Sequence, residues 1–568
     1  MKNALVAEIF RSIAQILQIR GDNRFRIRAY ERAAANVEGY AEDIESVARQ
    51  GRLQEIPGIG EDLSEKIEEI VRSGKLKFLD ELKREIPSGV LDLLSVPTVG
   101  PKTAQILYRQ LHIDSIAALR HAIEAHQLQA LAGFKEKTIE NIRKGVALVE
   151  KSRERMTLHQ AIQVSEKFVS ALKKLPRVEE IVCGGSLRRC KESVRDIDIL
   201  IVSGNPQAVM DAFCALPMAK EILAHGQTKA SVRTPAGVQV DCRVVEKKAF
   251  GAALVYFTGS KNFNIKLRML AQKKKAKINE YGLFKGERFI AGRTEEELFK
   301  ALGMQFVDPE IREDTGEIEL ALQGRLPRLV EHKDLKGDLH MHSAWSDGIS
   351  SIEEMARSAR SLGYSYIAVT DHSQGLKVAN GLSPASLLKK RKEIDALNRR
   401  LRGVRVLFGA EVDIDAEGRL DYPDAILKEF EIVVGAIHSG FKQPAGQITR
   451  RLIRACENKY VHIIAHPTGR LIGSREAYAF DMEAVLRSAA RTRTALEINS
   501  FPDRMDLNDT HCRMAKEAGV RISINTDSHA ADQLTNIRYG LAMARRGWLE
   551  AADVLNTLPL DQLLQELK

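Results

Sequence analysis

The sequence predicts a multidomain protein of mixed α+β and α/β class, and three observations lead to this prediction. A chain of 568 residues is too long for a single hydrophobic core. Residues 1–150 follow a helical period interrupted by Gly and Pro turns, and residues 151–245 change to mixed helix and strand. From residue 337 onward, apolar runs alternate with helical segments, which is typical of a parallel α/β barrel or sheet.

The charge of the chain favours an anionic partner. The formal net charge is +10 and the sequence pI is about 9.1. The excess is uneven, with +9 in residues 1–336 and +1 in residues 337–568. We therefore expect the part before residue 337 to hold nucleic acid.

Composition also indicates the compartment. The six cysteines include no close C-x-x-C pair, which argues against a disulfide scaffold and fits a reducing cytoplasm. Residues 1–20 carry charges within their apolar pattern, so they predict an amphipathic helix and not a signal peptide. No apolar run approaches the length that spans a membrane. We expect a soluble, cytoplasmic monomer.

Two segments of the helical part repeat. Residues 53–60 and 94–100 each place a Pro/Gly turn between two predicted helices, which is the helix-hairpin-helix pattern. The glycines Gly58, Gly60 and Gly100 let the turn approach a phosphate, and the helix that follows offers unpaired backbone N–H groups. One such turn alone is an ordinary helix connector. Two with matching flanks predict contacts to the DNA backbone that do not read sequence.

The mixed part contains a set of carboxylates after a glycine-rich loop. Asp196 and Asp198 face the same side of a predicted strand, and Asp241 lies in another strand. Three carboxylates suit two Mg²⁺ or Mn²⁺ ions, as nucleotidyl transfer requires. Asp-x-Asp alone is more often a solvent-facing strand edge. The preceding Gly-Gly-Ser-Leu-Arg-Arg loop, residues 184–189, is suited to a triphosphate and favours the catalytic interpretation.

A basic segment follows the carboxylates. Between Lys261 and Arg288 lie nine Lys and Arg residues against Glu280 and Glu287. A run of charge is usually only a solvated face, but this one lies beside the carboxylate set in sequence. Residues 318–336 are predicted to be the linker to the last domain.

The last part of the chain carries nine candidate metal ligands at the ends of predicted strands. A lone histidine is usually structural, whereas imidazole and carboxylate recurring at successive strand ends line the active site of a barrel. Nine are too many for one ion and predict two or three that share a bridging carboxylate. The candidates are His340, His342, Asp347, His372, Glu411, His438, His466, Asp527 and His529.

These motifs resemble the PHP (polymerase and histidinol phosphatase) domain, a distorted (β/α)7 barrel, over residues 337–568. The resemblance implies one ion at His340, His342, Glu411 and Asp527, a second at Asp347, His372 and His529, and a third at Glu411, His438 and His466. Mn²⁺ or Zn²⁺ is the expected metal. The neighbouring residues expected to orient the histidines are Asp338, Asp371, Asp413 and Asn499.

Residues 1–317 resemble a family X DNA polymerase. The resemblance implies a lyase-like helical domain over 1–85, fingers over 86–150, a nucleotidyltransferase-like palm over 151–245 and a thumb over 246–317. Asp196, Asp198 and Asp241 match the metal-binding carboxylates. The implied nucleotide contacts are Ser186 and Arg189 for the triphosphate, Tyr256, Phe257 and Gly259 for the sugar, and Asn264 and Arg268 beside the nascent pair.

Two positions depart from the repair branch of that family. Gln239 stands where those relatives have an arginine two residues before the third aspartate. Lys66 occupies the position of the lyase nucleophile and Tyr30 also matches, but Arg26 replaces the supporting lysine. Lys66 is therefore expected to contact DNA, with Schiff-base lyase activity as an open alternative.

The whole chain resembles the bacterial-type family X polymerase with a fused PHP domain. This resemblance implies an enzyme that uses dNTPs to fill gaps in double-stranded DNA during base excision repair. It also implies a metal-dependent 3′→5′ exonuclease in the PHP domain. AP-endonuclease or 3′-phosphodiesterase activity of that domain is left open. The alternatives are a small-molecule phosphatase with a DNA-binding appendage, which leaves the three aspartates without a use, and a DNA-binding scaffold without catalysis.

Overall fold

The computed structural model describes residues 2–38, 40, 44–86, 88–131, 133–153 and 155–567. The chain divides into two compact units. The first consists of Met1–Arg153 with the short segments Gly348–Ser350 and Gly473–Glu476, and the second contains the remainder. The finer domain boundaries given above stay a prediction.

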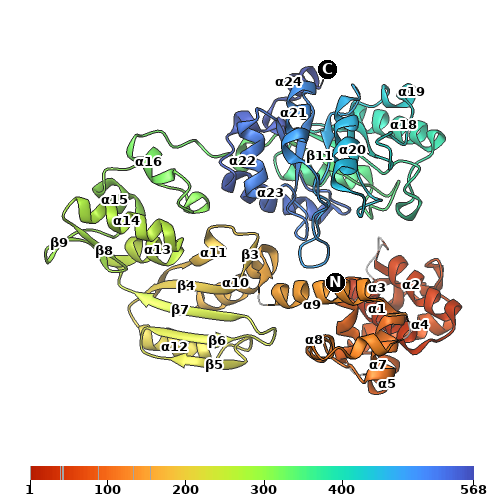
Figure 1. Ribbon diagram of the computed structural model, residues 1–568, viewed down its shortest axis with the longest axis horizontal. Coiled ribbons are helices and arrows are strands. Elements are labelled where there is room, and N and C mark those ends of the chain that lie inside the picture. The colour runs from red at the N-terminus through yellow and green to blue at the C-terminus, as the bar shows by residue number, and fades with distance from the viewer. Residues whose placement is uncertain are drawn as a thin grey trace. The chain divides into compact units, whose positions relative to one another are not determined.

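The first unit is helical (Figure 1), as the sequence predicts, and has its own hydrophobic core. Three short 3₁₀ turns connect its helices: η1 (Leu53–Glu55), η2 (Leu93–Ser95) and η3 (Gln127–Ala130). The helices are α1 (Lys2–Arg20), α2 (Arg24–Glu38), α3 (Ile44–Arg49), α4 (Glu61–Ser73), α5 (Lys77–Glu85), α6 (Ser88–Asp92), α7 (Pro101–Leu111), α8 (Ile116–Glu124) and α9 (Glu136–Arg153).

The second unit begins with a five-stranded sheet of order β2-β4-β7-β6-β5, in which β4 and β7 run parallel. Its strands are β2 (Val178–Cys183), β4 (Asp196–Ser203), β5 (Glu221–His225), β6 (Lys229–Arg233) and β7 (Gln239–Val245). Helices α10 (Leu158–Leu172) and α12 (Pro206–Cys214) pack on it, and β1 (Met156–Thr157) pairs with β3 (Ser193–Val194). The strands predicted around Asp196 and Asp241 correspond to β4 and β7.

A helical and hairpin segment with its own core follows. It carries a three-stranded antiparallel sheet, β8 (Lys277–Asn279), β9 (Gly282–Lys285) and β10 (Arg288–Ala291). Its helices are α13 (Phe250–Thr258), α14 (Lys261–Lys273), α15 (Glu295–Ala301) and α16 (Glu317–Leu322), with the 3₁₀ turn η5 (Pro309–Ile311) between the last two.

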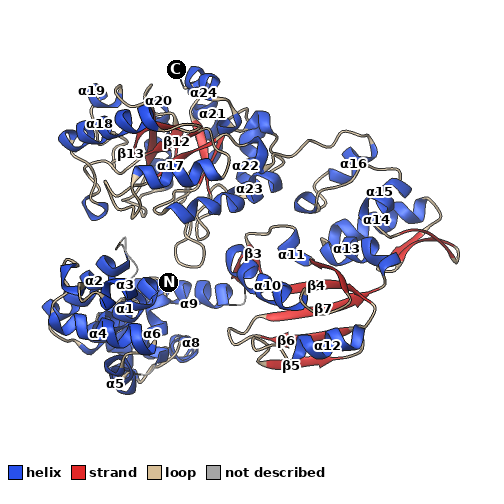
Figure 2. Ribbon diagram, turned by 180° about the vertical axis from the view of Figure 1, so that it is seen from behind, coloured by secondary structure: helices blue, strands red, loops and turns tan. Residues whose placement is uncertain are grey.

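The remainder is a barrel of seven parallel strands in sequential order. The strands are β11 (Gly337–Met341), β12 (Tyr366–Val369), β13 (Arg405–Asp413), β14 (Ile432–Ala436), β15 (Ile463–Ile464), β16 (Ala495–Asn499) and β17 (Ile522–Asn525). A parallel bridge between Met341 and Ser528 brings the first strand beside the last. Figure 2 shows the strands enclosed by helices. The predicted fold class is confirmed.

The outer helices of the barrel follow the strands in the expected alternation. They are α17 (Ile352–Ser361), α18 (Pro384–Arg400), α19 (Asp424–Leu427), α20 (Ala445–Glu457), α21 (Met482–Thr492), α22 (Asp509–Glu517), α23 (Ile537–Arg546) and α24 (Leu560–Glu566). Among the described residues, no helix has both the length and the apolar character needed to cross a bilayer.

Candidate active sites

The register of β4 against β7 brings the three predicted aspartates together. Asp198 lies directly opposite Asp241, and Asp196 lies two residues earlier in β4. All three are partly exposed, whereas the intervening Ile197 and Val240 are fully buried. Alternation along the strands therefore places the three carboxylates on one face of the sheet.

Like charges dominate this face. Burial and then the neighbouring Asp196 and Asp241 raise the pKa of Asp198 to about 6. A carboxyl group that resists ionisation beside two other carboxylates fits a site where a divalent cation would offset the charge. Asp241 accepts hydrogen bonds from Ser231 Oγ and from Gln239 Nε2, the latter at 3.2 Å to each carboxylate oxygen. Gln239 thus holds Asp241 without the arginine that the repair branch has there.

The glycine-rich loop packs directly against these carboxylates. The Gly184 N–H donates to the Asp198 carbonyl at 2.8 Å, and Gly185 has a φ of +62°. A Cβ on Gly185 would lie only 2.5 Å from Asp198 Oδ2, so no larger residue fits. The loop continues into the short helix α11 (Gly185–Arg188), which carries Ser186.

Arg189 follows α11 and reaches the turn after α13. Its Nη1 donates to the Thr258 carbonyl, and a Cβ on Gly259 would lie 3.2 Å from the same nitrogen. Its Nε donates to Glu313 Oε1 at 3.1 Å. The structure therefore places two predicted nucleotide contacts, Arg189 and Gly259, side by side.

The remaining predicted nucleotide contacts lie around the same turn. The side chain of Tyr256 is exposed, and Phe257 lies under the Arg243 guanidinium at 4.6 Å. Asn264 Nδ2 donates to the Tyr256 carbonyl at 2.7 Å, and Arg268 Nε donates to the Asn264 carbonyl at 3.2 Å. The turn and the first half of α14 thus form one hydrogen-bonded surface.

The barrel gathers all nine candidate ligands at the carboxyl ends of its strands or in the loops that follow them. His340 lies on β11 and Glu411 on β13, and the others come shortly after a strand. Glu411 is the centre of the set, because five imidazoles approach its two carboxylate oxygens. The partners are His466 and His438 at 3.0 and 3.3 Å from Oε1, and His372, His340 and His342 at 2.8, 3.5 and 3.5 Å from Oε2.

The ligand atoms fall into three groups close enough to share an ion. They are His342, Asp347, His372 and His529; His340, His342 and Asp527; and His372, Glu411 and His438. The groups overlap the three sets implied by the resemblance without matching them, because His342 and His372 each appear in two groups. His466 reaches the cluster through Glu411 Oε1.

Several donors in this cluster have the character of metal ligands. Although His372 Nδ1 lies 2.8 Å from Glu411 Oε2, His342 Nδ1 and Glu411 Oε2 are buried and make no well-aligned hydrogen bond, as expected of atoms that a cation would complete. Burial works to raise the pKa of Glu411, but His438, His372 and His340 hold it well below its usual value. A cluster of imidazole and carboxylate fits transition metals such as Mn²⁺ or Zn²⁺.

A second layer of polar residues surrounds the ligands, and Asp413 contacts a histidine ring directly. Asp413 Oδ1 lies 3.2 Å from His438 Nδ1, and Asn499 Nδ2 donates to Asp527 Oδ2 at 2.9 Å. Asp338 accepts from the His340 N–H, and Asp371 accepts from Ser343 while pairing with the buried Lys390 at 2.8 Å. All four residues expected here thus lie at the cluster.

Sequence reasoning missed one fully buried member of this layer, Glu497. Its Oε1 lies 2.7 Å from His340 Nδ1, and its Oε2 accepts from the His466 N–H at 2.8 Å. Glu497 precedes Asn499 by two residues on β16, so the two share a face of the strand. No motif surrounds Glu497 in the sequence, so no local signal pointed to it.

The two predicted hairpins of the helical unit have the same backbone form. In each, a 3₁₀ turn is followed by a residue with positive φ, Gly58 at +80° or Thr98 at +76°, and then by a glycine that caps a helix. Gly60 caps α4 and Gly100 caps α7, and the space where a Cβ would stand is open at both. A phosphate can therefore approach either helix N-terminus closely.

Lys66, on α4, is engaged within the protein. Its ammonium pairs with Asp62 one turn earlier and lies 5.7 Å from the centre of the Phe78 ring. The Tyr30 ring stacks on that of Phe78, with the ring centres 6.3 Å apart. The amine that the resemblance places at the position of the lyase nucleophile thus has a carboxylate partner.

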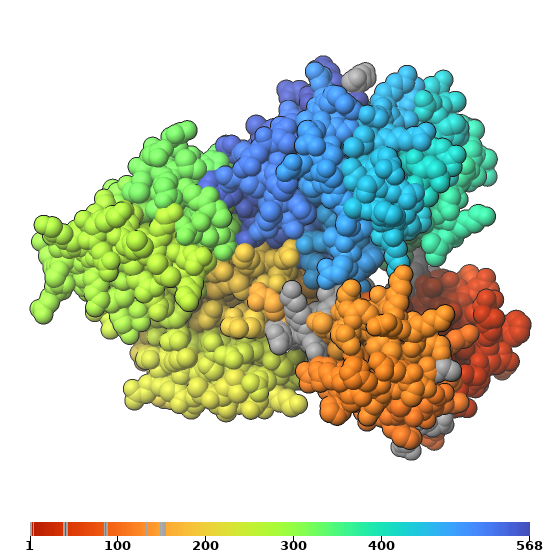
Figure 3. Space-filling view, viewed as in Figure 1, coloured from red at the N-terminus to blue at the C-terminus, as the bar shows by residue number. Residues whose placement is uncertain are grey.

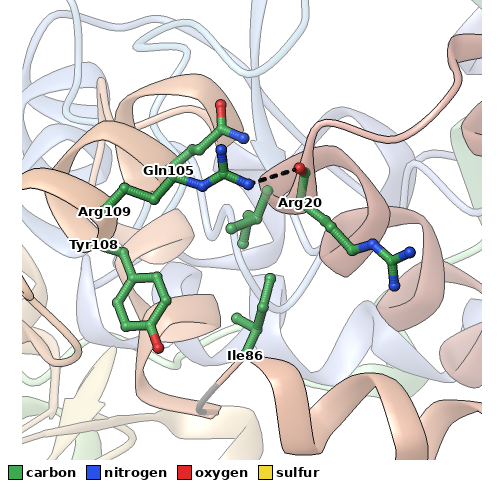
Figure 4. A pocket seen from close by; sticks show the side chains of 6 residues that line it. Arg20, Ile86, Gln105, Tyr108 and Arg109 are labelled. Atoms are coloured by element: carbon green, nitrogen blue, oxygen red, sulfur yellow. Dashed lines mark hydrogen bonds between the residues drawn. The ribbon is translucent and has the colours of Figure 1, made fainter.

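A small cavity of the helical unit lies apart from these residues. It is lined by Ile19, Arg20, Ile86, Gln105, Tyr108 and Arg109. Arg109 Nη2 donates to the Arg20 carbonyl at 3.2 Å (Figure 4). None of the predicted site residues lines it.

Known domain families match four parts of this architecture. A helix-hairpin-helix domain matches residues 1–76, a SAM-like helix-hairpin-helix tandem residues 90–147, the DNA polymerase beta thumb residues 253–313 and the PHP domain residues 338–501. The DNA polymerase/3′-5′ exonuclease PolX of Bacillus subtilis (strain 168) is 39% identical over 570 residues, covering 99% of each chain. The chain belongs to the PHP-containing family X DNA polymerases.

Other relatives match only one half of this family X chain. DNA polymerase lambda of Rattus norvegicus is 27% identical over 55% of this chain and 56% of its own length. A probable phosphatase of Thermoanaerobacter sp. (strain X514) is 33% identical over 39% of this chain and 89% of its own length. The phosphatase likeness therefore leaves more than half of the chain unexplained.

Proposed function

We propose that this protein is a gap-filling DNA polymerase of DNA repair whose barrel removes nucleotides from 3′ ends. The observation that carries the proposal is the assembly of two complete ligand sets in one chain. Three carboxylates line one face of the β4–β7 pair, and nine His, Asp and Glu residues line the mouth of the barrel. Similarity along nearly the whole chain to a DNA polymerase/3′-5′ exonuclease supports the same pairing of activities.

In the polymerase half, we assign a role to each predicted site residue. Asp196, Asp198 and Asp241 would hold Mg²⁺ or Mn²⁺, which activates the primer 3′-hydroxyl and stabilises the departing pyrophosphate when bound. Ser186 and Arg189 would bind the triphosphate of the incoming dNTP. The backbone of the Tyr256–Gly259 turn would contact the sugar, with Asn264 and Arg268 on the minor-groove side of the new pair.

DNA would be held mainly through its backbone. The N-termini of α4 and α7 offer N–H groups to phosphates, and Gly60 and Gly100 leave the approach open. We expect a preference for gapped or nicked duplexes with a 5′-phosphate, which the region of Gly58 and Gly60 would hold. Lys66 would contact DNA there, and its amine pairs with Asp62 in the free protein.

In the barrel, the nine ligands would hold two or three Mn²⁺ or Zn²⁺ ions, which supply an activated water when bound. Glu411 would bridge ions through its two oxygens, and Glu497 and Asp413 would fix the rings of His340 and His438. A small-molecule phosphatase is the weaker candidate, because it gives the three palm aspartates no role. We further propose that the protein acts as a monomer in the cytoplasm.

One labelled substrate tests both halves. A duplex with a short gap and a labelled primer is incubated with Mn²⁺, with and without dNTPs, and the product lengths are measured. Extension with dNTPs and shortening without them is the expected result. A protein that hydrolyses small phosphate esters but neither extends nor shortens the primer would overturn the proposal.

A further inference from the structure

The last turn of the barrel helix α23 ends in Arg545 and Arg546. Both side chains contact residues that precede the barrel in the sequence. Arg545 bonds to Glu310 Oε1 at 2.8 Å, to Asp308 Oδ1 at 2.9 Å and to the Val330 carbonyl at 3.2 Å. Asp308 and Glu310 lie at η5, in the segment between α15 and α16. In Figure 3 the green surface of this segment adjoins the blue surface of the barrel.

Arg546 is buried and reaches further than its neighbour. Only 2% of its side chain is exposed, and its Nε donates to Asp509 Oδ2 at 2.8 Å. Its Nη1 faces three acceptors: the Arg189 carbonyl at 2.7 Å, Glu313 Oε1 at 3.1 Å and the Glu310 carbonyl at 3.2 Å. A buried guanidinium is tolerated only where its donors are satisfied in this way.

Arg546 and the glycine-rich loop of residues 184–189 contact the same carboxylate oxygen, Glu313 Oε1. Glu313 Oε1 also accepts from Arg189 Nε at 3.1 Å and lies 3.3 Å from Lys191 Nζ. Burial works to raise the pKa of Glu313, but Arg189, Lys191 and Arg546 together hold it below its usual value. The carboxylate therefore stays charged and links the barrel arginine to the loop arginine.

Arg189 is consequently fixed at three points. Arg546 holds its main-chain carbonyl, Glu313 holds its Nε, and the Thr258 carbonyl holds its Nη1. Two of these three constraints depend on a residue of the barrel. A guanidinium fixed in this way loses less side-chain freedom when it meets a ligand.

We propose that Arg546, a barrel residue, is a positioning residue for nucleotide addition: it holds Glu313 and the Arg189 carbonyl so that the Arg189 guanidinium faces the incoming triphosphate. This inference rests on the proposed contact between Arg189 and the triphosphate. The barrel thus supports the polymerase site mechanically, apart from any nuclease chemistry of its own. Removal of Arg546 is expected to weaken dNTP binding, because Arg189 then has to be ordered when the nucleotide binds.

The test compares two adjacent arginines. Arg546→Met removes the contact to Arg189 and Glu313, whereas Arg545→Met removes ion pairs to the same segment without touching either. Steady-state extension of a gapped primer by the full chain gives KM for dNTP and kcat, and 3′-end degradation is measured in parallel. We expect Arg546→Met to raise KM about tenfold with kcat and degradation within about twofold, as loss of binding without loss of chemistry predicts.

Two further variants exclude a general structural effect. Arg546→Lys keeps the charge near Glu313 and is expected to restore part of the affinity for dNTP. Glu313→Gln is expected to raise KM as Arg546→Met does, and the double variant is expected to show no further increase, because the two residues act in one chain of contacts. These variants also report if Arg546→Met does not fold.

The outcomes separate the inference from the proposed function. An equal increase in KM for Arg545→Met would show that loosening any contact between α23 and the segment from α15 to α16 weakens dNTP binding. That result would overturn the specific role of Arg546. An unchanged KM for Arg546→Met and Glu313→Gln would do the same. An unchanged KM for Arg189→Ala would instead overturn the triphosphate contact on which the inference rests.

Discussion

At the scale of single residues, the carboxylate of Glu411 decides the geometry of the barrel site. Its two oxygens lie within 3.5 Å of five imidazole nitrogens, and only 1% of its side chain is exposed. Five of the eight other candidate ligands thus lie beside its carboxylate. Substitution here should therefore disturb more than one ion position.

We expect Glu411→Gln to abolish 3′-end degradation while extension of a gapped primer continues. The amide keeps the size of the side chain but loses the charge that would bridge two ions, so metal content should fall as well. His466→Ala should be milder, since it removes one imidazole that water can replace. Metal analysis of the full chain and a degradation assay, with Mn²⁺ and with Mg²⁺, measure both effects.

When metal is added back to the metal-free protein, 3′-end degradation should recover more with Mn²⁺ than with Mg²⁺, because imidazole ligands suit transition metals better than Mg²⁺. A Glu411→Gln protein that still shortens 3′ ends would show that the barrel cluster is not the nuclease. A wild-type protein without bound metal and without nuclease activity would indicate a scaffold.

The reciprocal variant is Asp198→Asn in the palm. It removes a carboxylate that faces Asp241 across the strand pair, and this should reduce nucleotide addition by at least about a hundredfold, as loss of a metal ligand implies. Degradation of 3′ ends should stay unchanged, because the two ligand sets lie in different sheets. Loss of both activities in a folded variant would contradict the two-site interpretation.

Sequence reasoning found site residues whose amino-acid type is unusual for their position in the chain. It missed a site residue whose type is ordinary for its position. Histidines at the ends of apolar strands are conspicuous, and Asp196 and Asp198 gain meaning from the glycine loop before them. Glu497 is an acid inside a strand and has no motif around it. Its role follows only from its 2.7 Å contact with His340, which is 157 residues distant in sequence.

At the scale of elements, periodicity predicted strands and hairpins but not how they meet. The repeated turns before α4 and α7 and the alternation of strand and helix after residue 337 could be predicted because they are local patterns. The register that sets Asp198 opposite Asp241 depends on sheet packing and has no local signal. Residues 318–336 were expected to be a linker, yet Leu329 and Val330 within this segment are buried.

A barrel element carries a prediction about pH. The side chain of His462 joins two strands, because its Nδ1 accepts a hydrogen bond from the Val433 N–H at 2.9 Å. Burial lowers the pKa of His462 to about 4. The protonated ring cannot accept that bond, so the folded state favours the neutral form.

The unfolded chain binds this proton near pH 6.5, and the folded chain binds it only near pH 4. Stability contributed by neutral His462 is therefore present above pH 6.5 and is lost as the pH falls toward 4, by up to about 3 kcal/mol. We expect the melting temperature of His462→Gln to fall less steeply than that of the wild type over this range. Parallel slopes in thermal unfolding at pH 7, 6 and 5 would argue against the prediction.

At the scale of the whole molecule, the distribution of charge separates two ways of holding DNA. Residues 1–150 contain as many Asp and Glu as Lys and Arg, so the proposed phosphate contacts of the hairpins would be made by backbone N–H groups without a net positive charge. The basic excess lies mainly beyond residue 150 and includes the segment from α14 to β10. Eight of its nine Lys and Arg residues are exposed, and the ninth, Lys266, pairs with Asp314 and Glu319.

This distribution predicts which lysines give DNA binding its salt dependence. Each exposed lysine that neutralises a phosphate releases a counterion, so the affinity of the full chain for gapped duplex should fall steeply with salt and hardly vary with sequence. Replacing both Lys273 and Lys277 by Ala should lower the slope of log K against log salt by about 2, since each phosphate contact contributes about 0.9. Lys266→Ala is the matched control and should leave the slope unchanged, because its charge is already offset by two carboxylates.

Fluorescence anisotropy over a series of salt concentrations, on two gapped duplexes of different sequence, measures the slope. An equal change for Lys266→Ala, or strong discrimination between the duplexes, would mean that binding does not depend on these exposed charges.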